Sequence, residues 1–260
     1  MQFTQKGLII RETPLKESDK MLTILTAEHG KMSVYAHGVR SFKSKYLHAS
    51  SLLSYSSFIL NKRGDSLTLC EASEIESFLG AQYDLTLYAL CQYVADVVGE
   101  LTVYDAPEEE MLSLALNTLW ALCNTRTPHK QIKAAFEIRA MSEAGFMPDI
   151  GGCSVCGENR PEMIFDIMNA NLYCPDCRGN EEERSRENTL SGTATILRRV
   201  RQETLEAMRY IISAGPKRIF SFSLDGELTD ELSYVTESYL LNHIGHGFKT
   251  LNFYKETSRL

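Results

Sequence analysis

Hydrophobic and polar positions alternate in short runs along roughly the first 75 residues, a pattern that predicts β-strands. One run begins at "GLIIRE". Two more surround a Glu-His-Gly-Lys turn in "MLTILTAEHGKMSVYAHGV", and another two surround Lys-Arg-Gly-Asp in "SYSSFILNKRGDSLTLCEAS". Such pairs of runs around Gly-containing turns are typical of hairpins. Five short strands of this kind predict a small closed barrel, the oligonucleotide/oligosaccharide-binding (OB) architecture.

The spacing of apolar residues then changes to three and four, which predicts helices. Proline followed by three glutamates begins one of them, and Gly145 is a plausible C-cap for another. We expect helices at residues 81–103, 107–123, 129–145, 191–214 and 227–244. The segment "RIFSFSL" at 218–224 fits either a strand or a helical turn.

Four of the seven cysteines form two Cys-x-x-Cys pairs with seventeen residues between the pairs. This spacing is typical of a four-thiolate zinc site, and "MIFDIMNANLYC" predicts a hairpin, turning at Asn169–Asn171, that returns the second pair to the first. The redox alternative requires a βαβ pattern that is missing here. We therefore predict one structural Zn²⁺ per chain, bound by Cys153, Cys156, Cys174 and Cys177.

These patterns predict an α+β multidomain protein, with a mainly helical C-terminal part and an inserted four-cysteine zinc finger. The expected domains are an OB-fold nucleic-acid-binding domain at 1–78, a helical domain at 79–147 and 189–260, and the zinc-finger insertion at 148–180. The charged segment "RGNEEERSREN" at 178–188 is typical of a linker.

Charge is unevenly distributed along a chain whose formal net charge is −7. Residues 1–63 carry ten Lys and Arg against four acids, a local charge of +6, which leaves −13 for the remainder. The N-terminal quarter could attract polyanions, although a solvated basic face is the ordinary alternative. For each aromatic there, core packing is the ordinary role. Candidate DNA contacts are Lys20, Lys31, Tyr35, His37, Arg40, Lys43, Lys45, Lys62 and Arg63, with Phe42 and Tyr46 as further rings that could stack.

Motifs for catalysis, export and membrane insertion are missing from the sequence. It has no His-Glu-x-x-His, Gly-x-Ser-x-Gly or Gly-x-Gly-x-x-Gly pattern, and "GHGFKT" at 245–250 lacks the glycine that a phosphate-binding loop places before lysine. No run approaches the roughly 18 apolar residues of a membrane span. An odd number of cysteines argues against a secreted disulfide framework. We expect a cytoplasmic protein that is not an enzyme and has no membrane partner.

Four stretches together resemble the RecO family of bacterial DNA-repair recombination mediators, over essentially the whole chain. They are "DKMLTILTAEHGKMSVYAHGVRSFKSK", "EIRAMSEAGFMPDIGGCSVCG", "CPDC" and "ELSYVTESYLLNHIGHGFKTLNFY". The resemblance implies a nucleoid-associated protein that binds single- and double-stranded DNA and anneals strands coated by single-stranded-DNA-binding protein. It also implies action with RecR, and in many bacteria RecF, to load RecA. All four cysteines match the metal-binding version of the family.

The resemblance also implies two sets of contact residues. Lys31, Arg40, Lys43 and Lys45 would carry most of the DNA contact. The acidic tail of single-stranded-DNA-binding protein would bind the helical domain, where positive charge comes from Arg126, Lys130, Lys133 and Arg139. From the residues alone, an OB-fold plus zinc-ribbon RNA-binding or transcription-associated protein remains the alternative.

Overall fold

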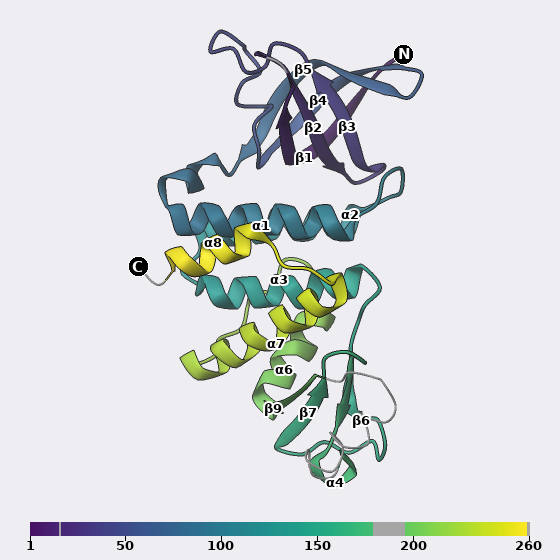
Figure 1. Cartoon of the computed structure of the whole chain (residues 1–260), viewed down its shortest axis with the longest axis vertical. Coiled ribbons are helices and arrows are strands. Elements are labelled where there is room, and N and C mark those ends of the chain that lie inside the picture. The colour runs from purple at the N-terminus through teal and green to yellow at the C-terminus, as the bar shows by residue number, and fades with distance from the viewer. Residues whose placement is uncertain (16, 179–195, 259–260) are drawn as a thin grey trace. The chain divides into compact units, whose positions relative to one another are not determined.

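The alternating runs of the N-terminal quarter form a closed five-stranded barrel, as predicted (Figure 1). Its strand order is β1-β2-β3-β5-β4, and β3 and β5 pair in parallel while the other pairs are antiparallel. This order closes the barrel in the way that defines an OB fold. The strands are β1 (Gln2–Pro14), β2 (Lys20–Thr26), β3 (Gly30–Ala36), β4 (Ser54–Arg63) and β5 (Ser66–Ser77).

One face of each strand fills the barrel interior. Ile9, Leu22, Ile24 and Phe58 lie in one buried cluster, and each is at most 1% exposed. The predicted turn before β3 depends on Gly30, whose φ of +57° places it in the left-handed region. A side chain there would also collide with the carbonyl oxygens of Val103 and Ala106.

Three helices belong to the same compact unit as the barrel. They are α1 (Leu85–Leu101), α2 (Glu109–Asn124) and α8 (Lys249–Thr257), and a short 3-10 helix, η1 (Leu79–Tyr83), precedes α1. The carboxylate of Asp84 accepts the N–H of Leu87 at 3.0 Å and caps α1. Helix α8, which the sequence patterns did not predict, packs along α1, where Thr250 Oγ1 donates to Asp96 Oδ2 at 2.8 Å.

A second unit combines three helices with a four-stranded sheet. Helix α3 packs against both α6 and α7, and the sheet has the order β6-β8-β7-β9 (Figure 1). The helices are α3 (His129–Glu143), α6 (Gln202–Ser213) and α7 (Gly226–Ile244), with a short α4 (Pro175–Arg178). The strands are β6 (Asp149–Cys153), β7 (Glu162–Asp166), β8 (Asn171–Tyr173) and β9 (Leu197–Arg201).

The prediction of a helix over 191–214 is wrong over residues 197–201. These residues form β9, which pairs antiparallel with β7 and buries Val200 completely, and the helix begins only at Gln202. The partner strand is distant in sequence, so local spacing could not reveal it. "RIFSFSL" forms neither a strand nor a helix.

The computed structural model describes residues 1–15, 17–178 and 196–258. The beginning of the predicted 191–214 helix and all of the charged linker after Arg178 lie outside the described residues. Contacts divide the chain into unit 1, residues 1–125 and 248–260, and unit 2, residues 126–247. The expected domain boundaries at 78, 147 and 180 stay a prediction. Within the described ranges, no helix is both long and apolar enough to cross a membrane.

Candidate functional site

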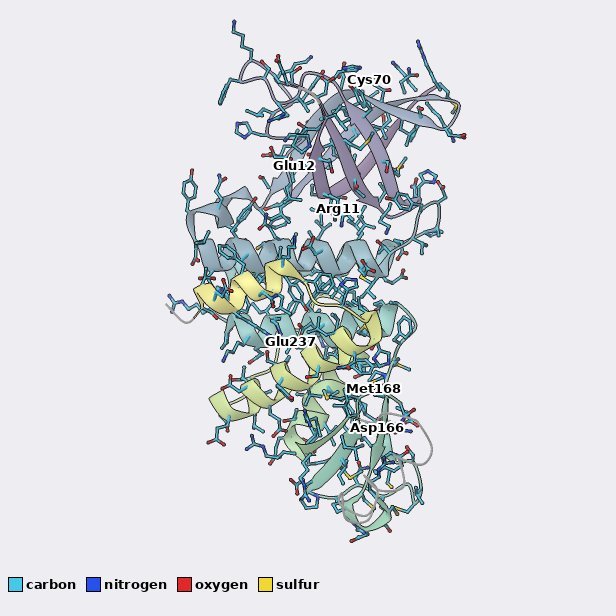
Figure 2. All side chains as sticks on the ribbon, viewed as in Figure 1. Arg11, Glu12, Cys70, Asp166, Met168 and Glu237 are labelled. Carbon is cyan, nitrogen blue, oxygen red and sulfur yellow. The ribbon has the colours of Figure 1, made fainter. Side chains whose placement is uncertain are left out.

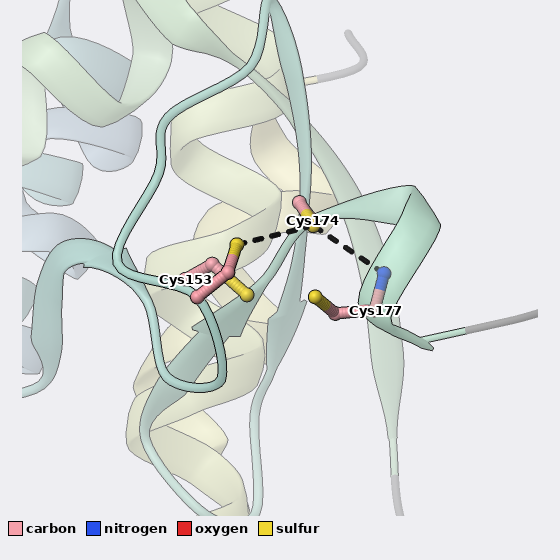
Figure 3. A group of neighbouring side chains, drawn as sticks. Cys153, Cys174 and Cys177 are labelled. Carbon is pink, nitrogen blue, oxygen red and sulfur yellow. Dashed lines mark hydrogen bonds between the residues drawn. The ribbon is translucent and has the colours of Figure 1, made fainter.

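Two neighbouring strands of unit 2 bring the four cysteines together. Cys153 ends β6, and Cys174 directly follows β8, which pairs in parallel with β6. Cys156 lies in the turn after β6, and Cys177 lies in α4. Figure 3 shows Cys153 on one segment facing Cys174 and Cys177 on the other. We call these four residues the cysteine centre.

The sulfur positions fit a single metal ion. All four Sγ atoms lie within 4.8 Å of one another, and those of Cys156 and Cys174 are 3.8 Å apart. A metal bound to four sulfurs at about 2.3 Å places neighbouring sulfurs about 3.8 Å apart at the corners of a tetrahedron. The cysteine centre could therefore hold one ion with no position left for water.

Backbone N–H groups favour the thiolate of Cys153, whereas the hydrogen bond with the neighbouring Cys174 sulfur raises the pKa of Cys177. Gly157 has a φ of +75°, and its N–H donates to the carbonyl of Cys153 at 2.8 Å, which closes the first tight turn. The N–H of Cys177 points at Cys174 Sγ at 3.4 Å (Figure 3). Burial raises the pKa of Cys153, but the N–H groups of Cys156 and Cys174 outweigh it and lower this pKa to about 6.

The hairpin that joins the two pairs is fixed by a buried carboxylate that sequence reasoning missed. Asp166 is 0% exposed and accepts the N–H groups of Met168 and Asn169 at 3.1 and 3.2 Å (Figure 2). The predicted turn at Asn169–Asn171 is confirmed, with Ala170 at a φ of +57°. An aspartate three residues before such a turn, where its carboxylate can accept the N–H groups two and three positions later, is the signal that could have identified it.

The segment between β3 and β4 is the most basic part of unit 1. Residues 37–53, here called the basic loop, contain three arginines or lysines and no acid. Arg40, Lys43 and Lys45 are all exposed, and the ammonium of Lys45 lies 4.8 Å from the centre of the Tyr46 ring. With His37, four of the predicted DNA contacts therefore lie on one loop.

Asp19 fixes the start of the basic loop, a role that sequence reasoning also missed. Its carboxylate accepts the Tyr35 hydroxyl at 2.6 Å and the Gly38 N–H at 2.9 Å. His37 Nδ1 lies 3.3 Å from the same carboxylate. The Tyr35 hydrogen bond, with that of Gly38, lowers the pKa of Asp19 to about 2. Tyr35 and His37, predicted as DNA contacts, therefore also anchor the loop.

The other predicted DNA contacts lie elsewhere on the barrel. Lys20 is only 7% exposed and pairs with Glu12 at 2.7 Å (Figure 2). The ammonium of Lys31 donates a hydrogen bond to the Gly99 carbonyl at 2.7 Å. One of its N–H groups is therefore already used near the C-terminal end of α1. Lys31 and Lys62 line one hollow of about 350 Å³, and the exposed Arg63 follows Lys62 as the last residue of β4. At about 3.3 Å per residue, β3 places the backbone of Lys31 roughly 20 Å from the start of the basic loop at His37.

Two of the four predicted tail contacts are enclosed in unit 2. The ammonium of Lys133 is 2% exposed and lies 2.9 Å from Glu137 and 3.0 Å from Glu237. Arg139 binds Glu143 and donates to the carbonyls of Ile211, Ile212 and Ala214 at the end of α6. Exposed positive charge in this set comes from Arg126 and from Lys130, which pairs with Asp230 at the surface.

Comparison with known proteins matches both parts of the chain to one family. The family model described as "Recombination protein O C terminal" matches residues 82–252, and "Recombination protein O N terminal" matches residues 1–78. The chain belongs to the RecO family. Together the two matches include the barrel, the basic loop and the cysteine centre.

Curated relatives extend this match over nearly the full length. The DNA repair protein RecO of Acetivibrio thermocellus is 29% identical over 98% of this chain and 96% of its own length. DNA repair proteins RecO of Caldicellulosiruptor bescii and Caldicellulosiruptor saccharolyticus are 25% and 27% identical, over 96% and 98% of this chain. The predicted family is confirmed.

Proposed function

We propose that this RecO-family protein is a non-enzymatic recombination mediator that binds single- and double-stranded DNA and anneals complementary strands. Its substrate would be DNA coated by single-stranded-DNA-binding protein, and with RecR and RecF it would promote loading of RecA in the cytoplasm, at the nucleoid. The observation that carries the proposal is the acid-free basic loop on an OB barrel. Cations on such a loop attract phosphates regardless of base sequence.

The metal proposed for the cysteine centre is Zn²⁺. Four thiolates form a soft donor set, and tetrahedral sulfur coordination is typical of zinc. Because Cys153, Cys156, Cys174 and Cys177 would complete the coordination shell, the ion would stabilise the fold of their two segments. A thiolate-bound ion with no open position supplies no reactive water, so this role agrees with a protein that performs no chemical step.

Charge reversal in the basic loop is expected to weaken DNA binding similarly for all base sequences. Lys43→Glu with Lys45→Glu removes two exposed cations, and for each phosphate that is no longer bound, the slope of log affinity against log salt should flatten by about 0.7 for single strands. Fluorescence anisotropy across a salt series measures this slope. The matched control is Lys217→Glu with Arg218→Glu, an exposed pair in unit 2 that changes net charge equally. An unchanged slope would contradict a phosphate-binding loop.

Annealing of coated DNA tests the mediator function directly. Complementary strands covered by the organism's own single-stranded-DNA-binding protein should anneal at least tenfold faster than strands covered by a version without its acidic tail, a difference of about 1.4 kcal/mol. Arg126→Glu with Lys130→Glu should remove this advantage and leave annealing of naked DNA within a few fold. Lys217→Glu with Arg218→Glu is the matched control, because it changes the net charge equally. Preferential binding of structured RNA, without annealing, would favour the RNA-binding alternative.

A further inference from the structure

The basic loop presents one large apolar ring to solvent. Phe42 is 98% exposed, although phenylalanine is a residue that normally stabilises a protein by being buried. It lies between Arg40 and Lys43, inside the acid-free segment 37–53. A ring that contributes so little to the fold and stands among cations points to a ligand.

Hydrogen-bonded turns hold this ring away from the barrel. The N–H of Ser41 donates to the Gly38 carbonyl at 3.3 Å, and the N–H of Ser44 donates to the Ser41 carbonyl at 2.8 Å, on either side of Phe42. The N–H of Arg40 donates to the Ser18 carbonyl at 3.0 Å, which ties the loop to the β1–β2 connection. The backbone around Phe42 is therefore organised before any ligand arrives.

The other rings of the region have partners within the fold. The Tyr35 hydroxyl is bonded to Asp19, and its ring meets His37 edge to face at 4.4 Å. Tyr46 packs against the barrel core and lies beside the ammonium of Lys45. Of the four aromatic side chains considered for base stacking, Phe42 is the one that the structure leaves almost completely exposed.

The cations around Phe42 favour a nucleic-acid ligand over a protein partner. A partner protein that binds an exposed phenylalanine needs an apolar pocket for the ring. To match the cations beside Phe42, that pocket would also need acidic residues around its rim. Single-stranded DNA supplies both chemistries at regular spacing, because each nucleotide carries one phosphate for a cation and one base face for a ring. In a duplex, neighbouring bases cover these faces, so a ring gains access only after unstacking.

We propose that Phe42 stacks on an unpaired base while Lys43 and Lys45 bind the adjacent phosphates, so that the ring distinguishes single strands from duplex. This inference rests on the proposed DNA-binding function and assigns strand selectivity to one side chain. The cations of the loop bind either form of DNA, and Phe42 adds affinity only where a base is free.

Truncation of the Phe42 ring is expected to weaken binding of single-stranded DNA and to leave binding of duplex DNA nearly unchanged. Phe42→Ala should weaken binding of an oligothymidylate at least about fivefold, the smallest effect of losing one base–aromatic stack. Binding of a blunt duplex with the same number of phosphates should stay within about twofold, because phosphate contacts remain. Phe42→Leu should behave like Phe42→Ala, since leucine is apolar but has no ring. Tyr83→Ala is the control. Like Phe42, Tyr83 is largely exposed, at 90%, but its neighbour Asp84 carries a negative charge where Phe42 has cations, so the loss of its ring should change neither affinity.

A fluorescent ring gives a second readout. The chain has one tryptophan, Trp120, so Phe42→Trp in a Trp120→Phe background places the only indole on the loop. Single-stranded DNA should quench the fluorescence of this indole, and duplex DNA should not. The fluorescence of a Tyr83→Trp protein in the same background should be quenched by neither. Equal losses of both affinities, or unchanged affinities in a protein that binds DNA, would overturn the stacking role alone. Failure of the wild-type protein to bind either DNA would overturn the proposed function itself.

Discussion

Serine in place of Cys174 is expected to cost the protein its bound metal and the folded structure of residues 149–178. Cys174 is 1% exposed, follows β8 and accepts the N–H of Cys177, so it joins the second pair to the sheet. A serine hydroxyl does not ionise at neutral pH and cannot replace the thiolate. Structural zinc contributes roughly 10–16 kcal/mol to the folding of small sites. That is comparable with the whole stability of a domain, about 5–15 kcal/mol.

Metal analysis and thiol titration measure this loss together. The wild-type protein should contain one zinc per chain and, when unfolded with metal retained, three reactive thiols, rising to all seven after chelation. Cys174→Ser should contain almost no metal and should be cleaved by protease within the cysteine segments. Cys70→Ser, outside the cysteine centre, should keep both metal and protease resistance. A metal-free wild-type protein with a Cys153–Cys156 disulfide would instead indicate redox chemistry.

A second large effect, on the free energy of unfolding, is expected when Lys133 inside unit 2 is replaced. Burial by itself lowers the pKa of this ammonium, but Glu137 and Glu237 outweigh burial and raise it above its usual value. Glu137 is 0% exposed and lies on the same helix, and Glu237 reaches Lys133 from α7 (Figure 2). Lys133→Met would leave Glu137 buried without its cation. Breaking a buried pair in this way costs roughly 3–5 kcal/mol.

Urea unfolding of a small set of variants tests this expectation. Lys133→Met should lower the free energy of unfolding by that amount, and adding Glu137→Met should restore part of it, because the fully buried carboxylate is then gone and only Glu237, whose side chain is 17% exposed, has lost its cation. Lys130→Met is a matched control on the same helix. Its ion pair with Asp230 is as short, at 2.7 Å, but both side chains are more than half exposed. Exposed pairs contribute at most about 1 kcal/mol. Equal losses for Lys130→Met and Lys133→Met would contradict the buried ion pair.

The barrel and the cysteine centre could be predicted because their signals are local. Alternation of period two placed the five strands, and turns such as that at Gly30 have their own residue preferences. The cysteine spacing predicted that the four cysteines come together, since one short hairpin joins the pairs. For these elements, the signal is carried by short stretches of sequence, although the strands and cysteine pairs that then meet are farther apart.

Individual site residues were harder to predict because their partners are distant in the sequence. Nothing near Lys31 indicates that Gly99 will accept its ammonium hydrogen bond. Lys133 and Glu137 have i,i+4 spacing, but the pair is buried in a unit where α3 packs against α7, which lies about one hundred residues away and supplies Glu237. Strand β9 likewise exists because of β7. A lysine in a basic stretch predicts a contact only if the fold leaves its charge exposed.

The division of unit 1 into two separated stretches sets the order in which it can be completed during protein synthesis. Its helix α8 buries Leu251 and Tyr254 to 1% and 5% exposure, and Phe248 meets Tyr93 of α1 edge to face at 5.5 Å. All of unit 2, residues 126–247, is synthesised between α2 and these residues. At 5–20 residues per second, that interval lasts roughly 6 to 24 seconds. During this time the apolar surface of α1 that α8 later covers stays uncovered on the nascent chain.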